Sequence, residues 1–221
     1  MNVAERLLRT KNQDGPDTAA EHARGRVSAA SAKTAVWNAE DMNFQNELIA
    51  RLGPRFHGFT GGKYAETIGG GFVQRPARSV VGQYILHHTA GPSSATGADI
   101  WRYHTKTRGW DTDGYHMLVS PDGSAELLIP PSMMSYGAAR FNPTTVHICC
   151  HGNYTLYGPS AAMLQTVYTI FLALDKCYGG KPWRGHKEIM PTACPGALLP
   201  HLERMRGAAY GDAAKPPVNY P

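Results

Sequence analysis

The clearest hydrophobic pattern in the chain lies between Pro159 and Tyr178. Six apolar side chains recur there at intervals of three and four residues: Met163, Leu164, Val167, Ile170, Phe171 and Leu174. That spacing places them on one face of a helix. Proline favours the first turn of a helix, and Gly179-Gly180 ends it. The pattern therefore predicts an amphipathic helix over residues 159–178.

Three further segments carry helical patterns. The segment Ala39–Leu52 has a candidate N-cap at Asn38 and a stop at Gly53-Pro54. Its apolar residues that can share one face are Met42, Leu48, Ile49 and Leu52. Residues 94–107 are expected to form a helix with Ile100, Trp101 and His104 on one side, and residues 197–205 a short closing helix.

Four β-prone apolar segments predict strands: Val80–His88, Tyr115–Val119, Ala125–Ile129 and Thr144–Cys150. A hairpin signal, Pro121-Asp122-Gly123, separates the second from the third. Strands that alternate with helices predict an α/β fold, with a central mixed β-sheet flanked by helices.

Three regions differ along the chain. Residues 1–79 are expected to form a partly helical N-terminal extension, in which positions 14–36 read as a weak helix or a loose arm. Within it, residues 58–71 are rich in glycine and predict a loop. Residues 80–206 carry the regular patterns and form the expected main domain. Residues 207–221 are small and proline-rich, as is typical of a flexible C-terminal tail.

Charge and composition narrow the function classes. The 221 residues carry a formal net charge of +5, which favours an anionic partner such as nucleic acid, a membrane surface or an acidic cell-wall polymer. No base-stacking motif accompanies the charge, so nucleic acid is not the expected partner. The N-terminus has no long apolar run, so we expect neither a Sec signal peptide nor stable membrane insertion. Nothing in the pattern indicates an oligomeric state.

The four cysteines are Cys149, Cys150, Cys177 and Cys194. Two of them are adjacent in an apolar strand, which disfavours a simple framework of two disulfides. Unpaired cysteines in a chain of this size indicate a reducing compartment.

A candidate metal site lies in the loop between Trp183 and Gly196. His186 and Cys194 stand eight positions apart there, and both side chains are good zinc ligands. The pair His87-His88, at the end of a predicted strand, offers a third ligand. Two imidazoles and one thiolate leave the fourth position open, as in catalytic zinc sites. The alternative is an ordinary surface histidine and an inert buried thiol.

Spacing does not choose between His87 and His88, because neighbours on a strand point to opposite faces. Tyr115 stands at a strand start, where its phenol can donate a hydrogen bond to a substrate carbonyl or orient a water molecule. Thr192 can offer a hydroxyl beside a metal. The alternative for Tyr115 is a tyrosine that only packs on the sheet, and the alternative for Thr192 is a threonine that stabilises a turn. Three more histidines read as packing residues or as partners of a ligand: His116, His147 and His151.

Other chemistries find no support in the sequence. The chain has no Gly-x-Gly-x-x-Gly motif, no Walker loop, no Gly-x-Ser-x-Gly elbow and no His-Glu-x-x-His motif.

Five segments, in order, resemble the zinc-dependent N-acetylmuramoyl-L-alanine amidases of the bacteriophage lysozyme and peptidoglycan-recognition protein family. They cover about residues 80–206 and read Tyr84-Ile-Leu-His87-His-Thr-Ala90, Gly109-Trp-Asp-Thr-Asp-Gly-Tyr115-His116, Val119-Ser-Pro-Asp-Gly123, the stretch from Asn142 to Tyr154 that ends in His-Gly-Asn-Tyr, and Gly185-His186 through Thr192-Ala-Cys194-Pro195. The resemblance implies the peptidoglycan-recognition and amidase type of fold, with zinc in a surface groove.

The resemblance also implies the roles of single residues. It makes His87, His186 and Cys194 the zinc ligands, and it places the catalytic positions at Tyr115 and Thr192. Two departures stand out. Many relatives carry a histidine in the loop before the central strand, whereas residues 135–142 hold none. Thr192 stands where others have lysine, so oxyanion stabilisation relies on zinc, Tyr115 and backbone donors.

The expected function is that of a phage endolysin that cuts the amide between the lactyl group of N-acetylmuramic acid and L-alanine of the stem peptide. Such an enzyme is expected to be made in the host cytoplasm and to reach the bacterial cell wall after release by a partner. The main alternative is a recognition module that binds peptidoglycan without cutting it; the resemblance implies that non-catalytic relatives lose the cysteine ligand, and Cys194 is present. A third possibility is a regulatory partner that binds another protein through residues 1–79.

Overall fold

A six-stranded mixed β-sheet forms the centre of the computed structural model, which describes residues 32 and 34–211. In sheet order the strands are β1 (Phe56–Phe59), β5 (Ala125–Leu127), β4 (Met117–Val119), β7 (Thr145–Cys150), β3 (Gln83–His88) and β8 (Trp183–Gly185). Only the β5–β4 pair within it is antiparallel. A small antiparallel sheet pairs β2 (Val73–Gln74) with β6 (Met133–Met134). The predicted mixed α/β architecture is confirmed.

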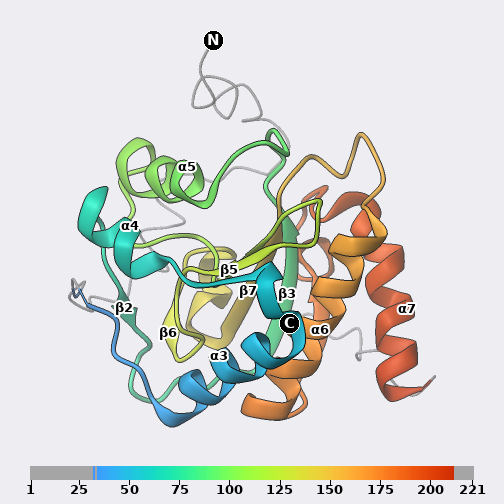
Figure 1. Ribbon diagram of the computed structural model, residues 1–221, viewed down its shortest axis with the longest axis horizontal. Helices are drawn as coiled ribbons and strands as arrows, with labels where there is room; N and C mark the ends of the chain where they lie inside the picture. Colours follow the sequence, from blue (N-terminus) through green and yellow to red (C-terminus); the bar gives the residue numbers. More distant parts are fainter. Residues whose placement is uncertain (1–31, 33, 212–221) are drawn as a thin grey trace.

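Helices cover both faces of the central sheet (Figure 1). The first face packs against α3 (Ala39–Leu52), α6 (Ala161–Tyr178) and α7 (Leu199–Tyr210), in a core that includes Leu86 and Ile148. The other face packs against α4 (Gly61–Thr67) and α5 (Gly97–Arg102), in a core that includes Leu118 and Cys149. Short 3-10 or π turns connect these elements: η1 (Gly53–Arg55), η2 (Tyr103–Thr107), η3 (Ala139–Thr144), η4 (His186–Glu188) and η5 (Gly196–Leu198).

Helix α3 has the predicted bounds and the predicted cap. The Asn38 side chain accepts a hydrogen bond from the Asp41 backbone N–H, and the Asp41 carboxylate accepts one from the Asn38 N–H. The expected apolar face was partly wrong, because Met42 and Ile49 are exposed. The helix instead buries Phe44, Leu48 and Leu52 with the Asp41 carboxylate, which also accepts from the Tyr178 hydroxyl.

The other three predicted helices differ from prediction mainly near their ends. Helix α6 begins at Ala161 because Ser160, not Pro159, caps it through the Met163 N–H. Helix α5 is shorter than predicted and continues as the π turn η2. Helix α7 runs to Tyr210, five residues beyond the predicted end.

Strand ends were predicted less well than strand centres. Strand β3 begins at Gln83 rather than Val80, and Val80 is 76% exposed, because the neighbouring strands offer no paired residue before that point. Strand β4 begins two residues later than predicted, and β5 ends at Leu127. Apolar residues extend beyond each ladder, so hydrophobicity alone overestimates its length.

The loop predicted over residues 58–71 was wrong, because that segment holds the end of β1 and all of α4. The glycines of this segment allow close packing of the backbone as well as chain reversal. A Cβ atom on Gly61 would lie 1.7 Å from the Leu128 carbonyl oxygen, so only glycine lets the first turn of α4 approach that backbone.

The predictions for the two ends of the chain can be compared with the structure only in part. Residues 207–210 belong to α7 rather than to a tail, whereas residues 212–221 lie outside the described residues. The weak helix or arm expected at positions 14–36 also lies mostly outside them. Strand β1 pairs with β5 inside the central sheet, so the segment before residue 79 takes part in the fold. The functional division of the chain at residue 79 stays a prediction.

Arg75 ties that N-terminal segment to the main domain. Its guanidinium donates hydrogen bonds to the carbonyl oxygens of Pro131, Asn142, Pro143 and Thr145, at 2.7–3.2 Å. One cation therefore supplies hydrogen bonds to four carbonyl groups from separate parts of the chain.

Replacing Arg75 with methionine is expected to lower the free energy of unfolding by roughly 2–4 kcal/mol, because the carbonyls would lose charged donors that an apolar side chain does not replace. Urea titration of the variant measures this loss. The matched control is Arg78→Met, since Arg78 is exposed and only three residues away. Equal midpoints for the two variants would show that the Arg75 network contributes little.

Candidate metal centre

Two strands bring the histidines of the candidate site together. Strands β3 and β8 are parallel, and Leu86 lies opposite Gly185. The next residue on each is a histidine, His87 at the end of β3 and His186 at the start of η4. Their ring centroids lie 4.5 Å apart. The pairing register therefore makes neighbours of two residues separated by about a hundred positions.

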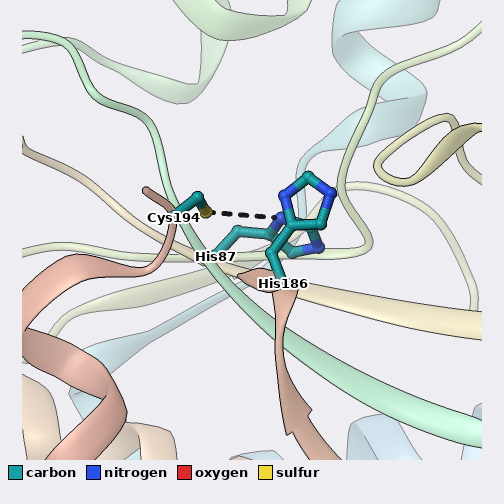
Figure 2. A group of neighbouring side chains, drawn as sticks. All are labelled: His87, His186 and Cys194. Atoms are coloured by element: carbon teal, nitrogen blue, oxygen red, sulfur yellow. Dashed lines mark hydrogen bonds between the residues drawn. The ribbon is translucent and has the colours of Figure 1, made fainter. Parts of the chain in front are cut away.

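The third member, Cys194, reaches the same point from the loop after η4. Its Sγ lies 3.7 Å from Nδ1 of His87. Its carbonyl oxygen accepts a hydrogen bond from the Lys187 N–H, which closes the loop back on η4. The three side chains point toward one another, and one ligand atom from each lies within 4.8 Å of the others (Figure 2).

The geometry and the donor set both fit zinc. Two ligands of one tetrahedral zinc, at bond lengths of about 2.0 Å to nitrogen and about 2.3 Å to sulfur, lie about 3.5 Å apart. The 3.7 Å between Sγ of Cys194 and Nδ1 of His87 matches this separation. The His88 backbone N–H also points at Sγ, at 3.3 Å, and such a donor stabilises a thiolate.

The buried imidazoles of the site are held neutral. Burial lowers the pKa of His87 well below its ordinary value, and nearby His186 and His88 act in the same direction. Burial also lowers the pKa of His147 well below its ordinary value. A neutral ring nitrogen is the form that binds a metal, so the site need not lose a proton from His87 at neutral pH.

The adjacent histidine, His88, points away from this site. Its Nδ1 accepts a hydrogen bond from the Tyr154 N–H, and burial lowers its pKa to about 4. Leu86 packs in the core beneath α6, and strand alternation gives His88 the same face, whereas His87 lies on the opposite face with His186 and Cys194.

Tyr115 and Thr192 both lie beside the three candidate ligands. The Tyr115 ring centroid is 5.5 Å from that of His87, and its backbone N–H donates to Oδ1 of Asp113. The Thr192 hydroxyl accepts a hydrogen bond from the Cys194 N–H at 3.1 Å. The structure brings together all five residues that the sequence analysis named, and their catalytic roles stay predictions.

Sequence reasoning left the role of His147 open. Its Nδ1 lies 2.9 Å from Nε2 of His87, and it is fully buried. The signal was present only in the register: Ile85 is opposite His147 on β7, and His87 is two residues further along the same face of β3.

A second group lies behind Tyr115 and was also missed. His104, from the π turn η2, contacts Asp113 through Nδ1 at 3.0 Å and stacks on Trp110 with 4.6 Å between ring centroids. The Tyr115 ring meets His104 edge-on at 5.4 Å. Tyr115 is thus held between the candidate ligand His87 and this buried His–Asp pair.

All four cysteines are free thiols, in agreement with the expectation from their spacing. In the described part of the chain, no helix is both long and apolar enough to span a membrane.

The sequence of this chain is similar to those of known proteins. A family model described as N-acetylmuramoyl-L-alanine amidase matches residues 77–197. The endolysin of Escherichia phage T7 is 27% identical over 129 residues, which cover 56% of this chain and 85% of that protein. Peptidoglycan-recognition protein SC1a of Drosophila melanogaster is 30% identical over 125 residues, which cover 52% of this chain and 68% of that protein.

A solved structure supports the same relationship. The Ph2119 endolysin, from a bacteriophage of Thermus scotoductus MAT2119, superposes with a TM-score of 0.60 and 27% identity, covering 68% of this chain and 97% of that one. The fold is therefore of the peptidoglycan-recognition and amidase type, as the motifs predicted.

Proposed function

This chain belongs to the N-acetylmuramoyl-L-alanine amidase family, and from that premise we propose that it is an endolysin-type hydrolase of peptidoglycan. Its target is the amide bond between the lactyl group of N-acetylmuramic acid and L-alanine of the stem peptide. The observation that carries the proposal is the convergence of His87, His186 and Cys194 on one point, with ligand atoms within 4.8 Å of one another.

In this proposal, His87, His186 and Cys194 hold a zinc ion and leave its fourth position open. Zinc, when bound, polarises the scissile carbonyl and lowers the pKa of a water ligand toward about 7. The three side chains supply a donor set of two neutral imidazoles and one thiolate, which keeps a net positive charge at the centre. An open position distinguishes this arrangement from a closed structural site.

The remaining work falls to Tyr115 and Thr192. The Tyr115 phenol donates a hydrogen bond to the oxygen that gains negative charge in the tetrahedral intermediate, and it helps to orient the attacking water. The Thr192 hydroxyl sits two residues before Cys194 and hydrogen-bonds to the water or the intermediate. Thr192 carries no charge, whereas a lysine at this position would add a positive charge near the oxyanion. Tyr115 and backbone donors therefore contribute a larger share of the oxyanion stabilisation.

The basic character of the chain fits an anionic wall polymer. The net charge of +5 favours binding to a cell wall that carries acidic polymers over binding to a neutral surface. We place synthesis in the host cytoplasm and action on the cell wall after release, in keeping with the endolysins among the relatives. Nucleic acid is not part of the proposal.

A recognition module that binds peptidoglycan without cutting it is the second candidate. It is favoured by the similarity to peptidoglycan-recognition proteins. The presence of Cys194 beside both histidines favours the hydrolase, because binding alone does not require a three-ligand metal centre.

Isolated peptidoglycan provides the test of the proposal. The purified protein is expected to release free N-terminal alanine, to stop when a zinc chelator is added, and to recover when zinc is returned. New reducing sugar ends in place of alanine would contradict the amidase assignment. Wall binding with zinc retained but no alanine released would establish the recognition module instead.

A further inference from the structure

His87 has a second buried contact besides Cys194. Its Nδ1 faces Sγ of Cys194 at 3.7 Å, and its Nε2 faces Nδ1 of His147 at 2.9 Å. Each ring nitrogen of His87 therefore has a neighbour: Nδ1 faces the candidate metal centre, and Nε2 faces a second imidazole. His87 and His147 are both almost fully inaccessible to solvent.

The proton positions follow from this arrangement. A neutral histidine that binds a metal through Nδ1 must carry its proton on Nε2. Nδ1 of His147 lies at hydrogen-bonding distance from that proton, so the His147 nitrogen must accept it. His147 then carries its own proton on Nε2, and this atom has no hydrogen-bond partner among the described residues.

We propose that His147 is a positioning residue of the metal centre, which accepts a hydrogen bond from His87 and so holds His87 in the tautomer and ring orientation that present Nδ1 to zinc. The inference deepens the proposed function and rests on it. Hydrogen-bond partners of this kind orient a metal-binding histidine and raise its basicity, and the partner is more often a carboxylate or a carbonyl oxygen than another imidazole.

The surroundings of His147 hold its ring in place. Its backbone N–H donates to Nδ1 of His116 at 2.9 Å, and the His116 N–H donates back to the His147 carbonyl. Nδ1 of His116 also faces the Ser135 hydroxyl at 2.9 Å, and its Nε2 lies 3.0 Å from the Met133 carbonyl oxygen and 3.2 Å from the Arg75 guanidinium. The His116 ring stacks on the His147 ring with 5.8 Å between their centroids, so these contacts also fix the place of the His147 ring.

The loop that covers His147 is shaped for an imidazole. A Cβ atom on Gly137 would lie 2.7 Å from both Cγ and Nδ1 of His147, and 2.7 Å from the Gly114 carbonyl oxygen. Gly137 therefore leaves room for the ring at the edge that accepts the His87 proton.

Zinc affinity, measured by competition with a chromophoric chelator, tests the role of His147. The variant His147→Leu, which offers no acceptor, is expected to bind zinc about 10–100-fold more weakly than the wild type. The variant His147→Asn places a carbonyl oxygen where Nδ1 lies, because Oδ1 of asparagine and Nδ1 of histidine are both bonded to Cγ, and it is expected to recover most of that loss. The matched control is His151→Leu, since His151 is equally buried and its Nδ1 has no partner among the described residues; it should bind zinc like the wild type.

The outcomes separate this inference from the proposed function. If the wild type binds no zinc, both fail. If the wild type binds zinc and His147→Leu binds it equally well, or if asparagine restores nothing, only the role of His147 is overturned. Should a variant not fold, nitrogen-15 NMR of the zinc-loaded wild type decides, because a His87 proton found on Nδ1 rather than Nε2 would contradict the proposal.

Discussion

Replacing Cys194 with alanine is expected to abolish zinc binding and amidase activity together. The thiolate is the only negatively charged member of the candidate ligand set, and its Sγ sits at the distance from His87 that one shared zinc ion requires. Two neutral imidazoles alone form a much weaker site. Zinc content by elemental analysis should fall from one equivalent to near zero, and release of free alanine should drop by more than about 10³-fold.

Cys177→Ala is the control for this prediction. Cys177 is a free, partly buried thiol on α6 that packs against the core on the α6 face of the sheet, whereas His87 lies on the opposite face. It should keep both zinc and activity, which separates the loss of a ligand from the loss of a thiol. If Cys194→Ala retained a full equivalent of zinc, the assigned ligand set would be wrong; if it lost zinc but still released alanine, the metal would not be the catalytic centre.

Replacing Tyr115 with phenylalanine is expected to lower kcat by about 10²–10³-fold while zinc stays bound. The ring would keep its place, because Tyr115 is anchored by its backbone bond to Asp113 and packs between His87 and His104. Only the hydroxyl would be lost. A donor that acts on charge formed in the transition state affects kcat more than KM, so both constants should be measured on a soluble muropeptide.

Tyr168→Phe is the matched control, since the Tyr168 ring packs edge-on against Trp183 on the far side of the sheet. It should leave kcat unchanged. A wild-type rate for Tyr115→Phe would remove the phenol from the mechanism, and a loss of zinc in that variant would show that Tyr115 supports the metal rather than the reaction.

The N-terminal segment of the protein shows where pattern reasoning was incomplete. Glycines over residues 58–71 read as a loop because glycine usually breaks regular structure. Gly61 instead occupies a helix start pressed against the Leu128 backbone, a contact that only the folded chain defines. Likewise, Met42 and Ile49 have the spacing of a buried face, but Asp41 is the residue that enters the interior because Ser132 and Tyr178 there satisfy its carboxylate.

The sequence by itself determined the elements whose causes are local. The cap at Asn38 and the apolar stripe of α6 involve neighbours within one or two turns, so they can be seen in the order of residues. The motifs also identified the family and named the five candidate site residues, because chemistry that depends on residue type leaves a record in the sequence.

Only the tertiary structure decided how those residues meet. The meeting of His87 with His186 and Cys194 depends on which face of β3 is turned toward the loop of Cys194, and the contact between His87 and His147 depends on the register of two strands sixty residues apart. Register and facing are properties of long-range pairing, because a shift by one residue would exchange every side chain between the two faces. For that reason the ligands of the proposed zinc site could be named from motifs, whereas the contact behind the proposed role of His147 appears only in the folded chain.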